Sequence, residues 1–164
     1  MPELNAPLYA HLERLNARGG LRFHMPGHKG KPLGSLLDGA MAIDYTEIPE
    51  TGNLYGEGGI IQQAEALAAA YWRAGQCFFL TCGATQGIKA ALNAFAGSGA
   101  PVVLDRNSHQ SAADACVLLD LSPAWVWPGL RASGLSGHIS PEALSEAFAV
   151  SGAKAAMVTS PTYY

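Results

Sequence analysis

The sequence predicts an α/β protein with a mostly parallel sheet and helices on both faces, a three-layer αβα arrangement. Two observations predict this class. From residue 59 onward, short apolar runs alternate with longer segments of helical periodicity. The apolar runs are nearly continuous, as in strands that are buried on both faces, and the helical segments between them allow neighbouring strands to run parallel.

The first 58 residues differ in composition and residue pattern from the rest of the chain. Leucines at helical spacing predict an N-terminal helix that ends at Gly19-Gly20; they are Leu4, Leu8, Leu12 and Leu15. Residues 21–58 read as irregular and are rich in glycine and proline. A stretch of this length inside a compact domain is usually functional or disordered. We therefore divide the chain into residues 1–58 and residues 59–164.

The second part contains four expected strands and four expected helices. Ser140 is a suitable N-cap, with Pro141 at the first helical position. The expected strands are 76–82, 101–105, 124–127 and 153–159, and the expected helices are 60–71, 85–96, 108–121 and 140–150. No internal repeat interrupts this order.

Composition excludes several functional classes. The 164 residues carry a net charge of −3, which offers no basic field for nucleic acid or an anionic membrane. No apolar run reaches transmembrane length, and the N-terminus has no apolar signal core. Cys77 and Cys82 lack the spacing of a zinc site and are expected to be buried as small hydrophobic residues. We expect a cytoplasmic protein without a metal site.

Polar groups follow the expected strands at the edge where ligands bind in such sheets. After the first strand, Gly83 permits close backbone approach and Thr85 offers a hydroxyl at the start of a helix, which suits a phosphate. Many tight strand-to-helix turns carry glycine and threonine for geometry alone, so this turn is also consistent with a purely structural role. After the second strand, His109 is suited to stacking on an aromatic ring, acting as an acid or base, or capping the next helix. The segment 159–164 ends the last strand at the same edge.

Five segments together resemble the Orn/Lys/Arg decarboxylase family, whose members use pyridoxal 5'-phosphate (PLP) on the fold type I, aspartate aminotransferase-like scaffold. They are FHMPGHKG at 23–30, DYTE at 44–47, FFLTCGATQG at 78–87, LDRNSHQS at 104–111 and TSPTYY at 159–164. They occur in the order of the family and span nearly the whole chain.

The resemblance implies a partial PLP-dependent transferase fold and a cofactor-binding role for four residues. Gly83, Ala84 and Thr85 match the phosphate-binding turn, and His109 matches the histidine that stacks on the pyridine ring. Ser160 and Thr162 match a loop that borders the cofactor. Residues 59–164 would then be the first part of the PLP-binding major domain.

The N-terminal signature of the family is matched by residues of the first segment: His28, Lys29, Asp44, Thr46 and Glu47. The active site of the family lies at a dimer interface. The resemblance therefore implies that residues 1–58 shape a pocket or the dimer, and that the protein is a homodimer or a higher homo-oligomer.

The resemblance also implies that this chain has no catalytic residue of its own. The protein must supply a lysine for the Schiff base and an acid partner for the pyridine nitrogen. In the family the aspartate lies in an Asp-Glu-Ala-His motif and the lysine follows a Ser-x-His pattern, and we expect both to come after residue 164. The lysines are Lys29, Lys31, Lys89 and Lys154, and none of them matches. We expect a chain that is truncated before these motifs and inactive alone.

Three positions depart from the family pattern. Ala84 replaces a hydroxyl residue in the phosphate turn, Ile88 stands where asparagine is common, and Gln110 stands where lysine is common. Loss of one hydrogen bond to phosphate costs about 1 to 3 kcal/mol if nothing replaces it. These departures indicate a divergent member or relaxed constraint.

Three interpretations remain open. The first is the N-terminal part of a lyase that decarboxylates arginine, lysine or ornithine to a polyamine precursor. The second is a short, noncatalytic relative that binds PLP or serves as a dimerisation partner. The third is a plain nucleotide- or phosphate-binding α/β module with GHKGKPLGS as a basic loop. Because the chain ends after an apolar strand, we expect it to associate with itself or a partner.

Overall fold

The computed structural model describes residues 6–162, and the chain forms two compact units, residues 1–79 and 80–164. Leu4, Tyr163 and Tyr164, which belong to patterns discussed above, lie outside the described residues. None of the described helices is long and apolar enough to cross a membrane.

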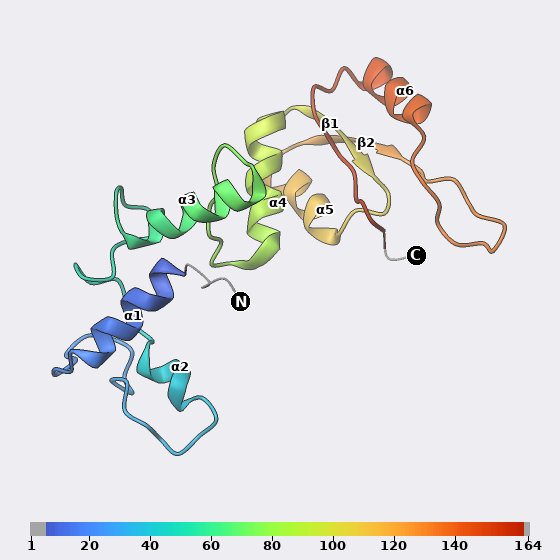
Figure 1. The fold of residues 1–164 in the computed structure, drawn as a ribbon. Coiled ribbons are helices and arrows are strands. Elements are labelled where there is room, and N and C mark those ends of the chain that lie inside the picture. Colours follow the sequence, from blue (N-terminus) through green and yellow to red (C-terminus); the bar gives the residue numbers. More distant parts are fainter. Residues whose placement is uncertain (1–5, 163–164) are drawn as a thin grey trace. The chain divides into compact units, whose positions relative to one another are not determined.

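The described residues of the first unit form three helices. Helix α1 (Pro7–Ala17) begins with proline at its first position, and α3 (Ile60–Trp72) ends at Arg73, which adopts a left-handed φ of 52°. The two helices pack against each other (Figure 1). Between them lies a short helix, α2 (Asp38–Ala42), which the sequence did not predict.

Helix α2 forms because its first residue organises the loop before it. The Asp38 carboxylate accepts hydrogen bonds from the backbone N–H groups of Leu33 at 2.9 Å and Gly34 at 3.0 Å. These bonds lower the pKa of Asp38, with the Leu33 bond as the largest cause. Five helical residues within a glycine- and proline-rich stretch give too weak a periodic signal to be predicted from sequence.

The second unit is a three-stranded parallel sheet with the order β2-β1-β3. Its strands are β1 (Pro101–Asp105), β2 (Ser122–Val126) and β3 (Ala156–Met157), and its helices are α4 (Gly83–Ala96), α5 (Gln110–Leu119) and α6 (Pro141–Ser151). The prediction of a parallel α/β fold is therefore confirmed. Helix α6 begins as predicted, with the Ser140 hydroxyl accepting a hydrogen bond from the Ala143 N–H at 3.1 Å.

The core lies on both faces of β1. Val102 and Leu104 are fully buried with residues of α4 and α5, in a cluster that includes Leu92 and Ala112. Because side chains alternate along a strand, the buried Val103 faces the opposite side. Helix α6 packs against β1 and β2 and lies across the sheet from α5 (Figure 1). Helices therefore cover both faces of the sheet.

The expected strand at 76–82 is wrong. No described strand pairs with these residues, and the run carries no strand hydrogen bonding. Phe78, Phe79 and Leu80 are exposed to different degrees, and Cys82 is also exposed while Cys77 is half-buried. The expected burial of Cys82 is therefore wrong, because an apolar run without a neighbouring strand cannot cover its side chains. Cys116 on α5 is the buried cysteine, and burial raises the pKa of its thiol.

Strand β3 is shorter than expected. Sequence predicted residues 153–159, but only Ala156 and Met157 pair with β1, opposite Val103 and Leu104. Among the described residues, β1 is its one neighbour. Because β3 has a neighbour on one side only, it forms backbone hydrogen bonds only where it lies alongside β1. The other residues of 153–159 therefore remain outside the sheet.

Shortening Leu104 should destabilise the second unit strongly. Leu104→Ala removes a side chain with no exposed surface and is expected to lower the free energy of unfolding by about 2 to 5 kcal/mol. Leu118→Ala is the control, since Leu118 on α5 is 67% exposed, and it should cost about 0.5 kcal/mol or less. Urea denaturation followed by circular dichroism measures both, and equal costs would contradict the assigned core.

Candidate cofactor-binding site

The carboxyl edge of the sheet is organised by Asp105, the last residue of β1. Its side chain is 1% exposed. Oδ1 accepts a hydrogen bond from the Asn107 N–H at 2.7 Å, and Oδ2 accepts one from the Thr159 N–H at 3.2 Å. A buried carboxylate needs such donors. Asp105 thereby joins the loop after β1 to the loop after β3.

Sequence reasoning did not single out Asp105. The available signal was a charged residue that ends an apolar strand, in the run PVVLD. Charged residues are almost never fully buried without partners, so an aspartate at this place predicts hydrogen-bond donors in the adjoining loops.

His109 caps helix α5. Its Nδ1 accepts hydrogen bonds from the Ser111 hydroxyl at 2.9 Å and from the Ser111 N–H at 3.2 Å. Accepting from a backbone N–H requires an unprotonated Nδ1, so the proton of the neutral ring is on Nε2. The capping role considered from sequence is confirmed, and His109 is an exposed residue.

The turn at Gly83, Ala84 and Thr85 forms the N-terminus of α4. Gly83 has a left-handed φ of 71°, and the space where its side chain would stand is open among the described residues. No described side chain caps the helix, and the Gln86 side chain instead accepts from the Cys82 N–H at 3.1 Å. The first N–H groups of the helix are therefore exposed and lack partners within the helix.

The two sequence-predicted segments lie at the same end of the helix pair α4 and α5. At the other end, the Leu119 carbonyl accepts hydrogen bonds from the Gly99 N–H at 2.8 Å and from the Ser98 hydroxyl at 2.9 Å. The chain reverses direction through β1 between the helices, so α4 and α5 run the same way. Their N-termini, which carry Thr85 and His109, both lie toward the carboxyl edge of the sheet.

The electrostatics of this edge favour an anion. The N-terminus of α4 carries the positive end of the helix dipole. Lys89 lies one turn after Thr85 and lines the same hollow, which has a volume of about 440 Å³. A phosphate at the turn would meet exposed N–H groups and the Thr85 hydroxyl.

Two buried polar atoms close to His109 lack partners. Asn107 Nδ2 and Ser108 Oγ are buried without a hydrogen bond among the described residues, although Asn107 Oδ1 accepts from the Ser136 hydroxyl at 3.0 Å. Buried donors are nearly always satisfied in proteins. Their place between β1 and α5 fits a polar group bound at this edge, so the residues present are compatible with a phosphate-bearing cofactor.

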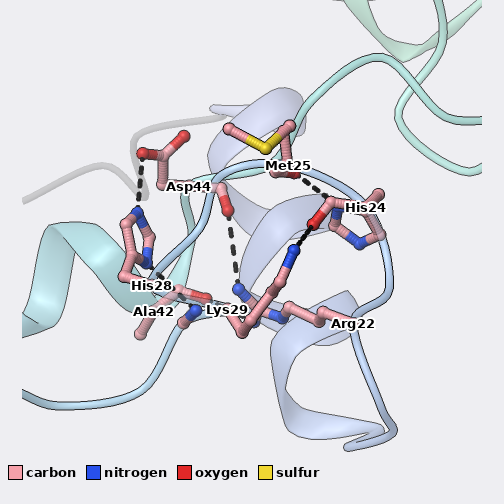
Figure 2. A network of polar contacts seen from close by, with 8 residues as sticks. Arg22, His24, Met25, His28, Lys29, Ala42 and Asp44 are labelled. Carbon is pink, nitrogen blue, oxygen red and sulfur yellow. Dashed lines mark hydrogen bonds and ion pairs between the residues drawn. The ribbon is translucent and has the colours of Figure 1, made fainter.

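The residues of the N-terminal signature have partners inside the first unit. His28 Nε2 lies 3.2 Å from Asp44 Oδ2 (Figure 2). The Glu47 carboxylate accepts from the Asn53 amide at 2.9 Å and from the Leu54 N–H at 2.8 Å. Within the described part of the chain, no cluster of histidine, cysteine, aspartate and glutamate could hold a metal ion.

Comparison with known proteins decides the family. Residues 6–164 match the family model of the Orn/Lys/Arg decarboxylase major domain. The chain belongs to the Orn/Lys/Arg decarboxylase family. The resemblance of its five sequence segments is thereby confirmed.

Relatives in this family are considerably longer. An arginine decarboxylase of Bacillus subtilis is 31% identical over 100% of this chain and 35% of its own length. The uncharacterised protein YaaO of the same species is 30% identical over 98% of this chain and also 35% of its own length. The chain therefore spans about a third of the length of these relatives.

The fold is similar to that of a solved decarboxylase. The structure of the constitutive lysine decarboxylase of Escherichia coli superimposes with a TM-score of 0.76 at 26% identity. The superposition covers 97% of this chain and 25% of the other. The parallel sheet and its helices thus correspond to part of a decarboxylase of this family.

Removing the Asp105 carboxylate should loosen both loops that it joins. In Asp105→Ala, the amides of Asn107 and Thr159 lose their acceptor, and we expect a loss of about 1 to 3 kcal/mol in unfolding free energy. Hydrogen exchange should accelerate at these two amides in particular. Asp114→Ala, on the exposed side of α5, is the control and should leave both amides protected. Unchanged exchange in Asp105→Ala would contradict the role of this carboxylate.

Proposed function

We propose that this chain is the N-terminal part of a PLP-dependent decarboxylase of basic amino acids and that its second unit holds the phosphate of the cofactor. The observation that carries the proposal is the exposed, uncapped N-terminus of α4 in a chain of the Orn/Lys/Arg decarboxylase family. Relatives named as arginine and lysine decarboxylases support a basic amino acid as the substrate of the whole protein.

The proposed phosphate anchor consists of Gly83, Ala84 and Thr85. Their N–H groups would donate to phosphate oxygens, and the Thr85 hydroxyl would add one further bond. Ala84 contributes only its backbone. Lys89, which lines the same hollow as Thr85, would add charge without a fixed geometry.

The proposed role of His109 is to hold the plane of the pyridine ring by stacking. Its hydrogen bonds to Ser111 fix one ring nitrogen and thereby limit rotation of the imidazole. A neutral, oriented ring can stack on a cofactor without adding positive charge beside the pyridine nitrogen. Asn107 Nδ2 and Ser108 Oγ, the two unpartnered donors next to it, are further candidates for polar contacts with a ligand.

When bound, PLP would supply the electron sink that stabilises the carbanion left by departing carbon dioxide. The lysine to which it would attach is not among the four lysines here. Lys89 lies on α4 four residues after Thr85, and Lys154 precedes β3. Lys29 and Lys31 belong to the first unit. We therefore propose that these 164 residues bind the cofactor without catalysing decarboxylation.

Two further proposals concern the domains of the chain and its cellular location. Residues 59–164 would begin the PLP-binding domain, and residues 1–58 would shape a pocket or the dimer. A cytoplasmic location agrees with three free cysteines, which suit a reducing compartment.

Removing the Thr85 hydroxyl should weaken PLP binding. Thr85→Val keeps the shape of the side chain and loses the hydrogen bond, so we expect the Kd for PLP to rise about tenfold, as for a bond worth about 1.4 kcal/mol. Thr85→Ser keeps the hydroxyl and should bind within about threefold of the original chain. Titration of PLP followed by its absorbance measures both.

Inorganic phosphate serves as the competitor in the same titration. If the phosphate anchor is correct, phosphate should displace PLP from the original chain and from Thr85→Ser. Equal affinities for the valine and serine variants, or binding that phosphate does not affect, would contradict the proposed anchor.

Association of the chain is supported by its exposed apolar side chains. On the second unit these include Phe95, Val117, Trp127 and Val150, each at least 70% exposed. Exposed apolar patches commonly mark protein contacts. We propose that the chain forms a homodimer or a higher homo-oligomer.

Light scattering coupled to size exclusion should report a mass above the 17.1 kDa of one chain. Because apolar contacts are not screened by salt, we expect the larger mass to persist at high ionic strength. A single monomeric species at all working concentrations would contradict self-association.

A further inference from the structure

The first unit contains a cavity of about 580 Å³ that the proposed decarboxylase site does not include. It lies where the end of α1 meets the FHMPGHKG segment and residues 45–50. The side chains that matter most for its chemistry are Arg22, His24, Lys29, Tyr45 and Glu50. Its volume is in the range of pockets that bind small molecules.

Arg22 is held in this cavity by fixed contacts. Nη2 donates to Asn16 Oδ1 at 2.7 Å and to the Ala42 carbonyl at 2.6 Å. The guanidinium carbon lies 4.0 Å from the centre of the Tyr45 ring. Figure 2 shows Arg22 joined by a dashed line to the backbone oxygen of Asp44. A cation fixed in this way is already oriented before any ligand arrives.

The backbone at Gly30 is adapted to Arg22. Gly30 has a left-handed φ of 69°, and a Cβ at this position would lie 2.2 Å from Arg22 Nη1. Any larger residue would displace the guanidinium. The glycine in the sequence GHKG therefore permits the guanidinium to lie directly against this backbone.

Lys29 reaches the same cavity from a strained backbone. It has a φ of 58°, which is uncommon for a residue with a side chain, and its Nζ donates to the His24 carbonyl (Figure 2). Hydrogen bonds in the turn fix this conformation, among them Lys29 N–H to the Pro26 carbonyl at 3.2 Å and Gly30 N–H to His28 Nδ1 at 3.1 Å. Such strain persists only where the surroundings hold it, and it is common at functional sites.

Neither cation has a carboxylate partner among the described residues. The one ion pair of the described chain joins His28 to Asp44, and Arg22 contacts Asp44 only through its backbone carbonyl. Glu50 is the one carboxylate residue among those that line the cavity. Two fixed cations against one carboxylate leave the cavity with an excess of positive charge.

Both cations also retain unused hydrogen-bond donors. A guanidinium has five N–H groups and an ammonium three. Among the described residues, Arg22 makes three contacts with oxygen acceptors, one of them long at 3.5 Å, and Lys29 makes one. The donors that remain can serve a ligand with several acceptor oxygens.

We propose that this cavity binds a small molecule through an oxyanion group, either a phosphate or a carboxylate. Arg22 and Lys29 would donate to the oxyanion, and the Tyr45 ring would hold the guanidinium in place. The site lies wholly within the first unit and uses none of the residues proposed to anchor PLP in the second.

The test is a titration of the full 164-residue chain by ¹H–¹⁵N NMR, with inorganic phosphate and with acetate in separate arms at constant ionic strength. We expect saturable shifts of the Gly30 and Tyr45 amides. Lys29→Gln should weaken the response at these amides by about tenfold or more, as expected for loss of a charge-assisted hydrogen bond. Tighter binding of phosphate or of acetate would assign the oxyanion class.

Lys31→Gln is the matched control, because it removes the same charge two residues away from a side chain that does not line the cavity. It should bind within about twofold of the original chain, since the Lys31 side chain is exposed and does not line the cavity. Lys29→Arg keeps the cation at the same backbone conformation and should restore most of the affinity. This variant separates loss of charge from damage to the turn.

Four results would overturn the proposal. Shifts at Gly30 and Tyr45 could fail to saturate in both arms, Lys31→Gln could weaken binding as much as Lys29→Gln, or Lys29→Arg could fail to restore it. Saturable shifts confined to residues 83–85 would also reject this cavity. That last pattern would leave the phosphate anchor of the second unit intact, so the two proposals fail separately.

Discussion

The second unit depends on β1, which lies between β2 and β3 and has four fully buried residues in a row. Val102 and Leu104 pack toward α4 and α5, while Val103 faces the side covered by α6. The strand ends in Asp105, whose buried carboxylate binds backbone N–H groups in two different loops. One strand thus supplies the centre of the core and also fixes the loops at the edge where a cofactor would bind. A change in this carboxylate affects the site and the sheet together.

Much of this fold could be predicted because its signals are local. The strand 101–105 and the helices at 85–96 and 140–150 are found close to their predicted bounds, since apolar runs, Ser140 and Pro141 mark them directly. The strand at 76–82 could not be judged in this way. Its apolar residues have the composition of a strand, but a strand exists only when a neighbour accepts its hydrogen bonds, and none of the described strands does. The shortness of β3 has the same cause.

Only part of the candidate site could be predicted from the sequence. Gly83 and Thr85 were predicted at a strand-to-helix turn. Helix α4 begins at Gly83, two residues before its predicted start, and no strand precedes it among the described residues. His109 was predicted near the same edge, but its hydrogen bonds to Ser111 required a structure. Asp105 was missed because its partners lie 2 and 54 residues away. Lys29 was assigned to an N-terminal signature, whereas its left-handed backbone and its contact with the His24 carbonyl place it in a cavity.

Our central proposal is that Gly83, Ala84 and Thr85 form a PLP phosphate anchor in a chain that lacks the lysine to which the cofactor would attach. The most direct test is to saturate the 164-residue chain with PLP, reduce it with borohydride, and measure intact mass and modified peptides. We predict that the bound cofactor is released on dialysis before reduction and that no single lysine carries a stoichiometric adduct after it. A complete adduct at one lysine, whether Lys29, Lys31, Lys89 or Lys154, would contradict the claim and identify an attachment site within this chain.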